Sequence, residues 1–379
     1  MRPRPIYLDY NGTTPVNPEV LEAMLPWLRE EFGNPSSKSV LGIRAKDAVE
    51  TARSEVANLI SAWPDEILFT SGGTESNNHA IIGGARLGRK KGRHIVTSAI
   101  EHPAVTEVCR FLANEEGFEV TAVPVDREGI VLLKDIEAAI RPDTVLISVM
   151  HSNNEIGTLQ PIGEIGRLAR ERGILFHTDA AQSPGKVSVD VRELQVDLLS
   201  IAGHKLYAPK GTGALFIRRG VDLPPFMHGA GQQQGRRAGT ENVPGWVALG
   251  KASQVAARDL EEASTQMRAA RDHLHESLQG IFPNLVLNGH YRQRLPNTLS
   301  VSFPGLGAYR LLEAMGDKVS ASSGSACHSG RTTISPVLAA LGVDEAVGTG
   351  TIRFSTGKNT TLDETKAACS VLSQILGNI

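Results

Sequence analysis

A lysine that closes an apolar segment is the first residue of this sequence that could do covalent chemistry. Lys205 follows Ser200-Ile-Ala-Gly-His204, where a run of apolar residues ends beside glycine and histidine. In a semi-enclosed site, desolvation would lower the pKa of such an amine and let it form a Schiff base. The alternative is a lysine whose stem packs against the strand end while its charge reaches solvent, which is the more common arrangement.

Two further polar motifs also follow predicted strands. Phe69-Thr-Ser-Gly-Gly-Thr-Glu75 places Gly73 and Thr74 where a helix is expected to begin, so free amides there could hold a phosphate. Phe176-His-Thr-Asp179 ends in a carboxylate that could bind a ring nitrogen. The structural alternatives are an N-cap with turn glycines and a helix-capping Asp. Because parallel strands open their carboxyl ends onto one crevice, three such motifs favour a common site.

A cysteine in a Ser/Gly-rich stretch is a further candidate nucleophile. Cys327 lies in Ser320-Ala-Ser-Ser-Gly-Ser-Ala-Cys-His-Ser-Gly330, a composition that predicts a mobile loop. A thiol on such a tether could reach a bound substrate and attack its sulfur as a thiolate. Most free cysteines are buried small hydrophobes instead, and Cys109 and Cys369, each in a helical pattern, fit that description.

Apolar periodicity predicts the scaffold that must position these residues. From residue 15 to about 220, short apolar segments alternate with helical patterns, which indicates an α/β fold with a largely parallel sheet. The predicted strands of this region are 67–69, 94–100, 118–125, 144–150, 174–177, 196–202 and 213–218. The predicted helices include 18–32, 42–60 and 161–173.

The pattern changes near Asn242, where a second, smaller α+β domain is expected. The elements predicted there are a long helix over 243–281, extended segments at 298–303 and 350–354, and helices at 307–315 and 361–378. We place the domain boundary near residue 255. The large domain then comprises 15–255, and residues 1–14 join 256–379 in the small domain, which carries the cysteine segment at about 320–332.

Composition excludes several classes of protein. The 379 residues include 39 Lys and Arg against 41 Asp and Glu, a net charge of −2, so no basic excess indicates binding to nucleic acid or to a membrane surface. The three cysteines have neither metal-ligand nor disulfide spacing, and no metal site is predicted. No apolar run has the length of a signal peptide core or a membrane span. We therefore expect a cytoplasmic protein with reduced thiols.

Taken together, these motifs resemble those of the pyridoxal-phosphate-dependent cysteine desulfurases. This family belongs to the fold-type I, class V aminotransferase group, which also includes selenocysteine lyase. The resemblance covers nearly the whole chain, through segments 7–15, 33–37, 70–77, 101–103, 152–157, 178–182, 203–205, 235–242, 324–327 and 352–355. It implies a large cofactor-binding domain with a mainly parallel sheet flanked by helices, and a smaller α+β C-terminal domain.

The resemblance also implies residue roles. Lys205 would bind the cofactor covalently and remove the Cα proton of the substrate, Cys327 would accept sulfur as a persulfide, and His102 would stack on the cofactor ring. The other implied cofactor contacts are Asp179 at the pyridine nitrogen, Gln182 at the ring hydroxyl, Thr74 and His204 at the phosphate, Gly73, Asn154, and Thr240 from the neighbouring subunit of a homodimer. The implied substrate contacts are Asn11, Asn34, Asn154 and Arg353, with Arg353 clamping the carboxylate.

The implied activity is conversion of L-cysteine to L-alanine, with sulfur passing from Cys327 to an acceptor protein such as an iron–sulfur scaffold or a thiolation enzyme. The nearest alternative is a selenocysteine lyase acting on L-selenocysteine, because segments 326–329 and 335–338 are similar to segments of those enzymes. A class V aminotransferase needs no such cysteine. An inactive scaffold would not need Lys205, Asp179, His102 and Arg353 together.

One position departs from the family pattern. Many desulfurases carry a phosphate-contacting serine two residues before the histidine, where this chain has Ala202. The resemblance therefore does not imply that hydrogen bond to the phosphate in this chain, and Ser200 could partly compensate for it.

Overall fold

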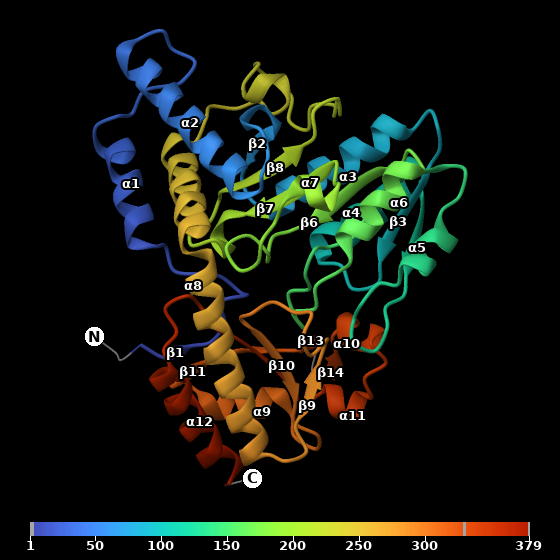
Figure 1. Cartoon of the computed structure of the whole chain (residues 1–379), viewed down its shortest axis with the longest axis vertical. Helices are drawn as coiled ribbons and strands as arrows, with labels where there is room; N and C mark the ends of the chain where they lie inside the picture. The colour runs from blue at the N-terminus through green and yellow to red at the C-terminus, as the bar shows by residue number, and fades with distance from the viewer. Residues whose placement is uncertain (1–3, 329–330, 378–379) are drawn as a thin grey trace.

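Two lobes make up the molecule, a larger one around a seven-stranded sheet and a smaller one around a four-stranded sheet (Figure 1). The computed structural model describes residues 4–328 and 331–377, without the side chains of residues 325–332. Among the helices in these ranges, none combines the length and apolar character needed to cross a membrane.

The sheet of the larger lobe confirms the predicted α/β fold. Its strands are β2 (Ile67–Thr70), β3 (His94–Ser98), β4 (Glu119–Val123), β5 (Thr144–Ser148), β6 (Leu175–Asp179), β7 (Leu198–Ala202) and β8 (Gly213–Ile217). They lie in the order β2-β8-β7-β6-β5-β3-β4. The strand β8 is antiparallel to β2 and β7, and the other neighbours are parallel. All seven correspond to predicted strands.

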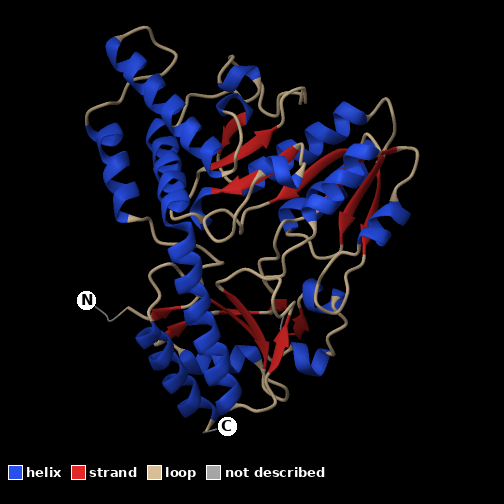
Figure 2. Ribbon diagram, in the orientation of Figure 1, coloured by secondary structure: helices blue, strands red, loops and turns tan. Residues whose placement is uncertain are grey.

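Helices cover both faces of this sheet (Figure 2). They are α1 (Pro18–Arg29), α2 (Val40–Leu59), α3 (Gly73–Gly88), α4 (Pro103–Glu116), α5 (Leu133–Ala139), α6 (Ile162–Glu171) and α7 (Val191–Leu194). Successive side chains of a strand point to opposite faces of the sheet, so they pack in different apolar clusters. Leu198 packs in one cluster with Ala80 of α3, whereas Leu199 packs in another with Ile165 of α6. Burial on both faces explains why several of the strands, such as β5 and β7, are nearly continuous apolar runs.

A long helix, α8 (Val243–Ile281), connects the two lobes and has the predicted bounds. Its N-terminus is capped by the Asn242 side chain, which accepts a hydrogen bond from the Gly245 amide at 3.2 Å. The first half of α8 packs against α2, and the second half contributes Leu274 and Leu278 to the core of the smaller lobe (Figure 1). Residue 255 lies within this helix, and the domain boundary there stays a prediction.

The smaller lobe contains the second sheet, with strands in the order β12-β15-β10-β9. These are β9 (Val286–Asn288), β10 (Thr298–Ser302), β12 (Ser322–Ser323) and β15 (Thr351–Ser355). Near the N-terminus, β1 (Ile6–Tyr7) pairs in parallel with β11 (Val319–Ser320), so the start of the chain belongs to this lobe. The helices are α9 (Ala308–Met315), α10 (Pro336–Ala340), α11 (Glu345–Gly348) and α12 (Leu362–Leu376).

The expectation of a loop around Cys327 is wrong for the described backbone. Strands β13 (Ser325–His328) and β14 (Arg331–Ile334) form an antiparallel hairpin in which Cys327 pairs with Thr332. The base of the hairpin is fixed, because the Gly324 amide donates to the Thr351 carbonyl at 2.8 Å. Ser and Gly disfavour strands only weakly, and backbone pairing overrides that preference here. The side chain of Cys327 lies outside the described residues, so its predicted exposure and mobility stay predictions.

The contact between α2 and α8 yields a stability prediction. A Cβ atom on Gly250 would lie 2.5 Å from the Ala52 Cα atom, whereas one on Gly280, in the same helix, meets nothing within 4 Å. We expect Gly250→Ala to lower the free energy of unfolding by about 1–3 kcal/mol through overpacking. The matched Gly280→Ala should raise it by about 0.5–1 kcal/mol, because alanine is the better helix former. Urea unfolding measures both, and equal stabilities would contradict the close helix packing.

Candidate active site

The predicted site residues lie where the strands of the larger sheet end. Asp179 is the last residue of β6, and Lys205 closes the short 3-10 turn Gly203–Lys205 that follows β7. Thr74 lies in the first turn of α3 after β2, and His102 is the N-cap of α4 after β3. These strands share one direction, so their carboxyl ends open onto one cavity of about 320 Å³.

This cavity brings together most of the residues predicted for the site. The predicted residues that line it are Asn11, Gly73, Thr74, His102, Asn154, Asp179, Gln182, His204, Lys205 and Arg353. Ala202 lines it as well. The larger lobe supplies most of these side chains, whereas Arg353 comes from β15 of the smaller lobe. The cavity therefore lies at the junction of the two lobes.

Lys205 is half-buried, and its amine points at the N-terminal segment. Its Nζ atom donates hydrogen bonds to the carbonyl oxygens of Asn11 and, at 2.6 Å, of Gly12. Burial, together with the positive charge of Arg353, lowers the pKa of Lys205 to about 8, against the opposing charges of Asp9 and Asp179. A substantial fraction of the amine is therefore neutral near pH 8, as a nucleophile requires.

Asp179 presents a buried carboxylate to the cavity. Its Oδ2 atom accepts a hydrogen bond from Asn77 Nδ2 at 2.7 Å, and its Oδ1 atom accepts one from the Ala181 amide at 2.9 Å. His102 Nδ1 accepts a hydrogen bond from the Ala104 amide at 3.1 Å, so a neutral His102 ring carries its proton on Nε2. Both side chains are thus held in one orientation by contacts to the fold.

An anion could bind at the start of α3. The N-cap of this helix is Gly72, and no side chain caps it. Thr74, His204 and Lys210 line the adjoining hollow, so backbone amides, a hydroxyl and a cationic side chain face the same space. His204 Nδ1 lies 3.2 Å from Thr13 Oγ1, and burial together with the charge of Lys205 lowers the pKa of His204 to about 4. His204 is therefore a neutral partner at pH 7.

The suggestion that Ser200 replaces the missing phosphate contact at Ala202 is wrong. Ser200 is fully buried in β7, and its Oγ atom lies 3.0 Å from His177 Nε2 of the neighbouring strand β6. The hydroxyl is thus engaged inside the sheet and does not line the cavity, whereas Ala202 at the end of the strand does.

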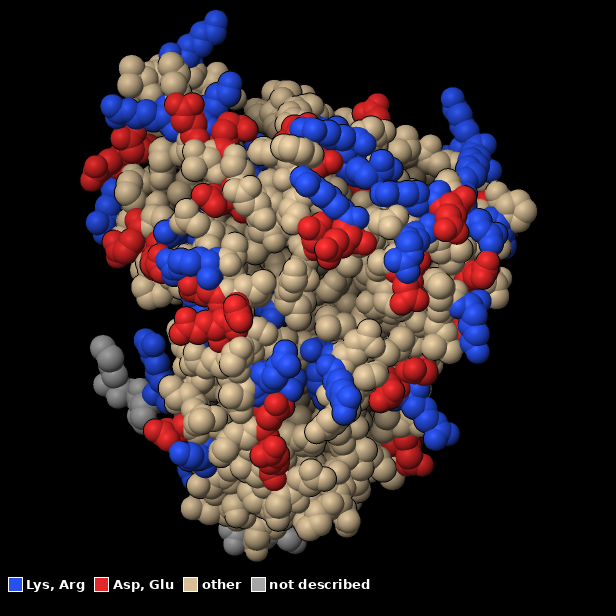
Figure 3. Space-filling view, in the orientation of Figure 1, with Lys and Arg blue, Asp and Glu red and all other residues tan. Residues whose placement is uncertain are grey.

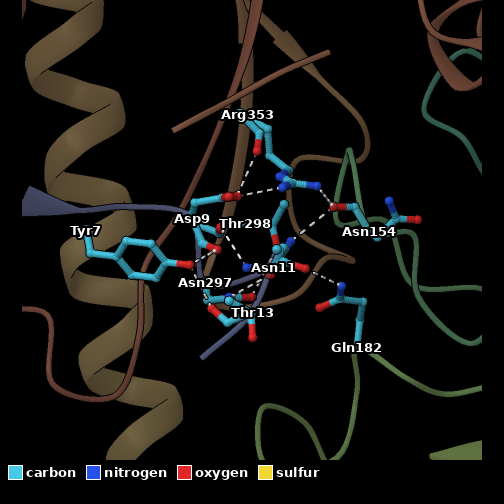
Figure 4. Close-up of polar contacts among 12 residues, drawn as sticks. Tyr7, Asp9, Asn11, Thr13, Asn154, Gln182, Asn297, Thr298 and Arg353 are labelled. Carbon is cyan, nitrogen blue, oxygen red and sulfur yellow. Dashed lines mark hydrogen bonds and ion pairs between the residues drawn. The ribbon is translucent and has the colours of Figure 1, made fainter. Parts of the chain in front are cut away.

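Arg353 is held in place from two sides (Figure 4). Its Nη2 atom forms an ion pair with Asp9 Oδ1 at 2.6 Å, and its Nη1 atom donates to the Asn154 carbonyl at 3.1 Å. The Nε atom is buried and has no partner among the described residues. The guanidinium group is fixed in orientation but keeps donors for an incoming carboxylate, which suits bidentate recognition.

Three residues that support the site were missed at the sequence level. Asn77 orients Asp179, and Asp9 orients Arg353; both lie in motifs that match the family, which is a signal that could have found them. Lys186 is 4% exposed, and its Nζ atom donates to Gln182 Oε1 at 2.8 Å. This contact leaves Gln182 Nε2 as the amide end that donates hydrogen bonds. Nothing in the local sequence marks Lys186 as buried.

Three predicted residues are not placed in the cavity. Asn34 is exposed near the start of α2, where its side chain accepts a hydrogen bond from the Ser36 amide at 2.9 Å. Thr240 is exposed on the single chain, as a contact to a neighbouring subunit would require. The side chain of Cys327 lies outside the described residues. The roles of these three residues stay predictions.

The groups in the cavity fit pyridoxal 5′-phosphate. An uncapped helix N-terminus suits a phosphate, a buried carboxylate suits a protonated ring nitrogen, and an amine with a lowered pKa suits an aldehyde. The cavity volume lies at the lower end of the range for small-molecule sites.

Comparison with known proteins agrees with the fold and the site. The Aminotransferase class-V family model matches residues 6–367. The cysteine desulfurase IscS of Methanosarcina thermophila is 48% identical over 372 residues, which are 98% of this chain and 92% of the relative. A structure of a NifS-like protein superposes with a TM-score of 0.93 at 38% identity and covers 100% of both chains. A structure of SspA in complex with cysteine has a TM-score of 0.82 at 38% identity, over 93% of this chain and 99% of the other.

The fold and the cavity therefore define an enzyme of the class V aminotransferase group, whose cofactor is pyridoxal 5′-phosphate. Within that group, the chain belongs to the cysteine desulfurase family.

The lowered pKa of Lys205 predicts how cofactor attachment depends on pH. Below about pH 8 the amine is mostly protonated and cannot attack, so the rate of attachment to cofactor-free protein should rise with pH and level off above about 8. The visible absorption of the attached cofactor reports this rate. Because Arg353 lowers the pKa, Arg353→Ala should move the midpoint to higher pH. A wild-type midpoint near 10.5, the ordinary value for lysine, would contradict the assignment.

Proposed function

We propose that this chain is a homodimeric cysteine desulfurase that converts L-cysteine to L-alanine and transfers the substrate sulfur to Cys327. One observation carries the proposal. Strand β15 brings Arg353 into the cavity that contains Lys205 and Asp179, and the same strand pairs with β12, which leads into the Cys327 hairpin. Cofactor chemistry, a carboxylate-binding group and a thiol-bearing segment are thereby connected through adjacent backbone.

Substrate binding starts from the carboxylate. Arg353 offers the donors that Asp9 and Asn154 leave free, and the guanidinium fork matches a carboxylate in two-point contact. Lys205 of the larger lobe lines the same cavity, so a substrate held by its carboxylate shares the enclosure with the amine. Because Arg353 is held before substrate arrives, little conformational entropy is lost on binding.

Proton transfer is assigned to Lys205. When bound, pyridoxal 5′-phosphate supplies an electron-accepting ring that stabilises negative charge at the substrate Cα. Asp179, fixed by Asn77, would hold the protonated ring nitrogen of the cofactor. The neutral Nζ atom of Lys205, with a pKa of about 8, takes the proton from Cα and returns it later. His102, held at the N-cap of α4, would stack its ring on the cofactor.

Sulfur transfer is assigned to Cys327. Its thiolate attacks the substrate sulfur, so that an S–S bond forms as the Cβ–S bond of the substrate breaks. The substrate carbon skeleton takes up protons and leaves as L-alanine, and the enzyme thiol becomes a persulfide. Gly324, three residues before Cys327, donates its amide to the carbonyl of Thr351 in β15, so the base of the hairpin lies beside the strand that carries Arg353. Three residues span at most about 10 Å.

The partners follow from the same chemistry. A persulfide must be passed on, and the sulfur acceptor is proposed to be a protein such as an iron–sulfur scaffold or a thiolation enzyme. Asn34 and Thr240, exposed on one chain, are proposed to complete the site of a second subunit. The cytoplasm is the proposed compartment, because persulfide formation needs a reduced thiol.

A selenocysteine lyase is the second candidate function. It is favoured by one observation, the similarity of segments 326–329 and 335–338 to those enzymes. A selenol is ionised at neutral pH, so such an enzyme would release selenium without Cys327.

Alanine formation from the two substrates separates these functions. We expect wild type to form alanine from L-cysteine at a rate that falls by a factor of about 100 or more in Cys327→Ala, since no thiolate remains to accept sulfur. Lys205→Ala, which cannot attach the cofactor, is the inactive reference. If L-selenocysteine is the better substrate and its turnover survives Cys327→Ala, the chain is a lyase. Turnover of L-cysteine that survives Cys327→Ala would contradict the role of the thiol.

Arg353 gives a second test, specific to substrate binding. Arg353→Ala should raise KM for L-cysteine about tenfold to a hundredfold, because a charge-assisted contact to the carboxylate is lost. Arg353→Lys keeps the charge but not the two-point geometry, so its KM should lie between those of wild type and Arg353→Ala. Steady-state kinetics measure both, and an unchanged KM in Arg353→Ala would refute the clamp.

A further inference from the structure

A second cavity, of about 410 Å³, lies in the smaller lobe and is rich in arginine. One wall is a face of α8, and the opposite wall consists of β9, β10 and the segment between them. The lining residues include Arg268, Arg271, Arg292, Arg294, Tyr291 and Leu287. Figure 3 shows Lys and Arg side chains gathered on this side of the smaller lobe, with acidic side chains below them. The proposed active site shares no lining residue with it.

The charges of this cavity are not balanced. Four arginines and two acidic residues, Asp272 and Glu276, line it, which leaves a net charge of +2 when His275 is neutral. Burial and the charge of Arg294 lower the pKa of His275, which favours that neutral form. Asp272 is already engaged, because its Oδ1 atom pairs with Arg271 Nη2 at 2.5 Å.

The other three arginines have no carboxylate partner within residues 4–328 and 331–377. Arg294 is the most informative of them, because it is 6% exposed. Its Nη2 atom donates to the carbonyl oxygens of Ile156, at 2.9 Å, and Asn288, at 3.4 Å. Its Nε atom is buried without a partner in the described part of the chain, and burial lowers its pKa to about 9. A buried guanidinium without an anion is costly, and an anionic ligand would offset that cost.

We propose that this cavity binds a small phosphate-bearing ligand. A phosphate dianion matches the net charge, and its terminal oxygens match the forked donors of several guanidinium groups, whereas one carboxylate would neutralise only one of them. The volume exceeds that of a free phosphate, and Tyr291 and Leu287 provide a partly apolar wall for an organic group. Concave walls and a buried arginine favour a small molecule over a flat protein surface.

Arg294 also connects this cavity with the proposed active site. It forms a β-bridge with Thr158, and the next residue, Leu295, donates its amide to the Gly157 carbonyl at 2.9 Å. The segment 156–158 begins two residues after Asn154, whose carbonyl accepts the hydrogen bond from Arg353. A ligand that binds Arg294 therefore acts on the segment 154–158, which orients the substrate-binding Arg353.

Calorimetric titration of the holoenzyme tests the site. The probes are inorganic phosphate, adenosine 5′-monophosphate, uncharged adenosine and succinate, and the bound cofactor keeps its own phosphate position filled. The monophosphate should bind, and Arg268→Gln and Arg292→Gln, both at exposed positions, should each weaken binding about tenfold or more. Arg110→Gln, which removes an exposed arginine from α4, is the matched control and should leave binding unchanged.

The outcomes distinguish the steps of the proposal. No binding of either phosphate probe, or equal binding in the Arg268 and Arg292 variants, would overturn the site. Succinate that binds as tightly as the monophosphate would overturn the choice of phosphate. The monophosphate should also shift KM for L-cysteine in wild type and not in Arg292→Gln, and an unchanged wild-type KM would overturn the connection through Arg294.

Discussion

The buried hydrogen bonds of Asn11 are the constraint on which the active site depends. This residue is 1% exposed, and it lies in the segment that leads from β1 of the smaller lobe to α1 of the larger lobe. Its backbone and side chain bond to Lys205 and Ser355 and, as Figure 4 shows, to Asn154, Gln182, Asn297 and Thr298. Since buried polar groups are costly without partners, these contacts determine how the two lobes meet.

The junction of the lobes has electrostatic consequences. Lys205 comes from the larger lobe and Arg353 from the smaller one, and their like charges face a common cavity. The proximity of Arg353 and the partial burial of Lys205 both lower the pKa of the amine. Asp9 limits the effect, because it pairs with Arg353 and raises the pKa of Lys205. The same contact that orients the carboxylate-binding group therefore helps to set the protonation of the lysine.

The scaffold could be predicted because its signals are local. Strands buried on both faces, such as β5, form continuous apolar runs, and all seven strands of the larger sheet were predicted, as was the full length of α8. The predicted strand ends then indicated a common site for Lys205, Asp179 and Thr74, because the carboxyl ends of parallel strands lie at the same edge of the sheet. The hairpin that carries Cys327 was missed, because a Ser/Gly composition does not reveal whether the backbone is paired.

The burial of individual polar side chains was the other property that could not be predicted from the sequence. Ser200 and Ala202 lie two residues apart in one strand, yet the first bonds to His177 inside the sheet and the second lines the cavity. Lys186 looks like a surface lysine in the sequence, but it is buried beneath Gln182. By itself, the sequence determined the order of the elements, the family and most of the residues in the cavity. Only the tertiary structure decided which side chains support them, because burial and hydrogen-bond partners arise from segments distant in the chain.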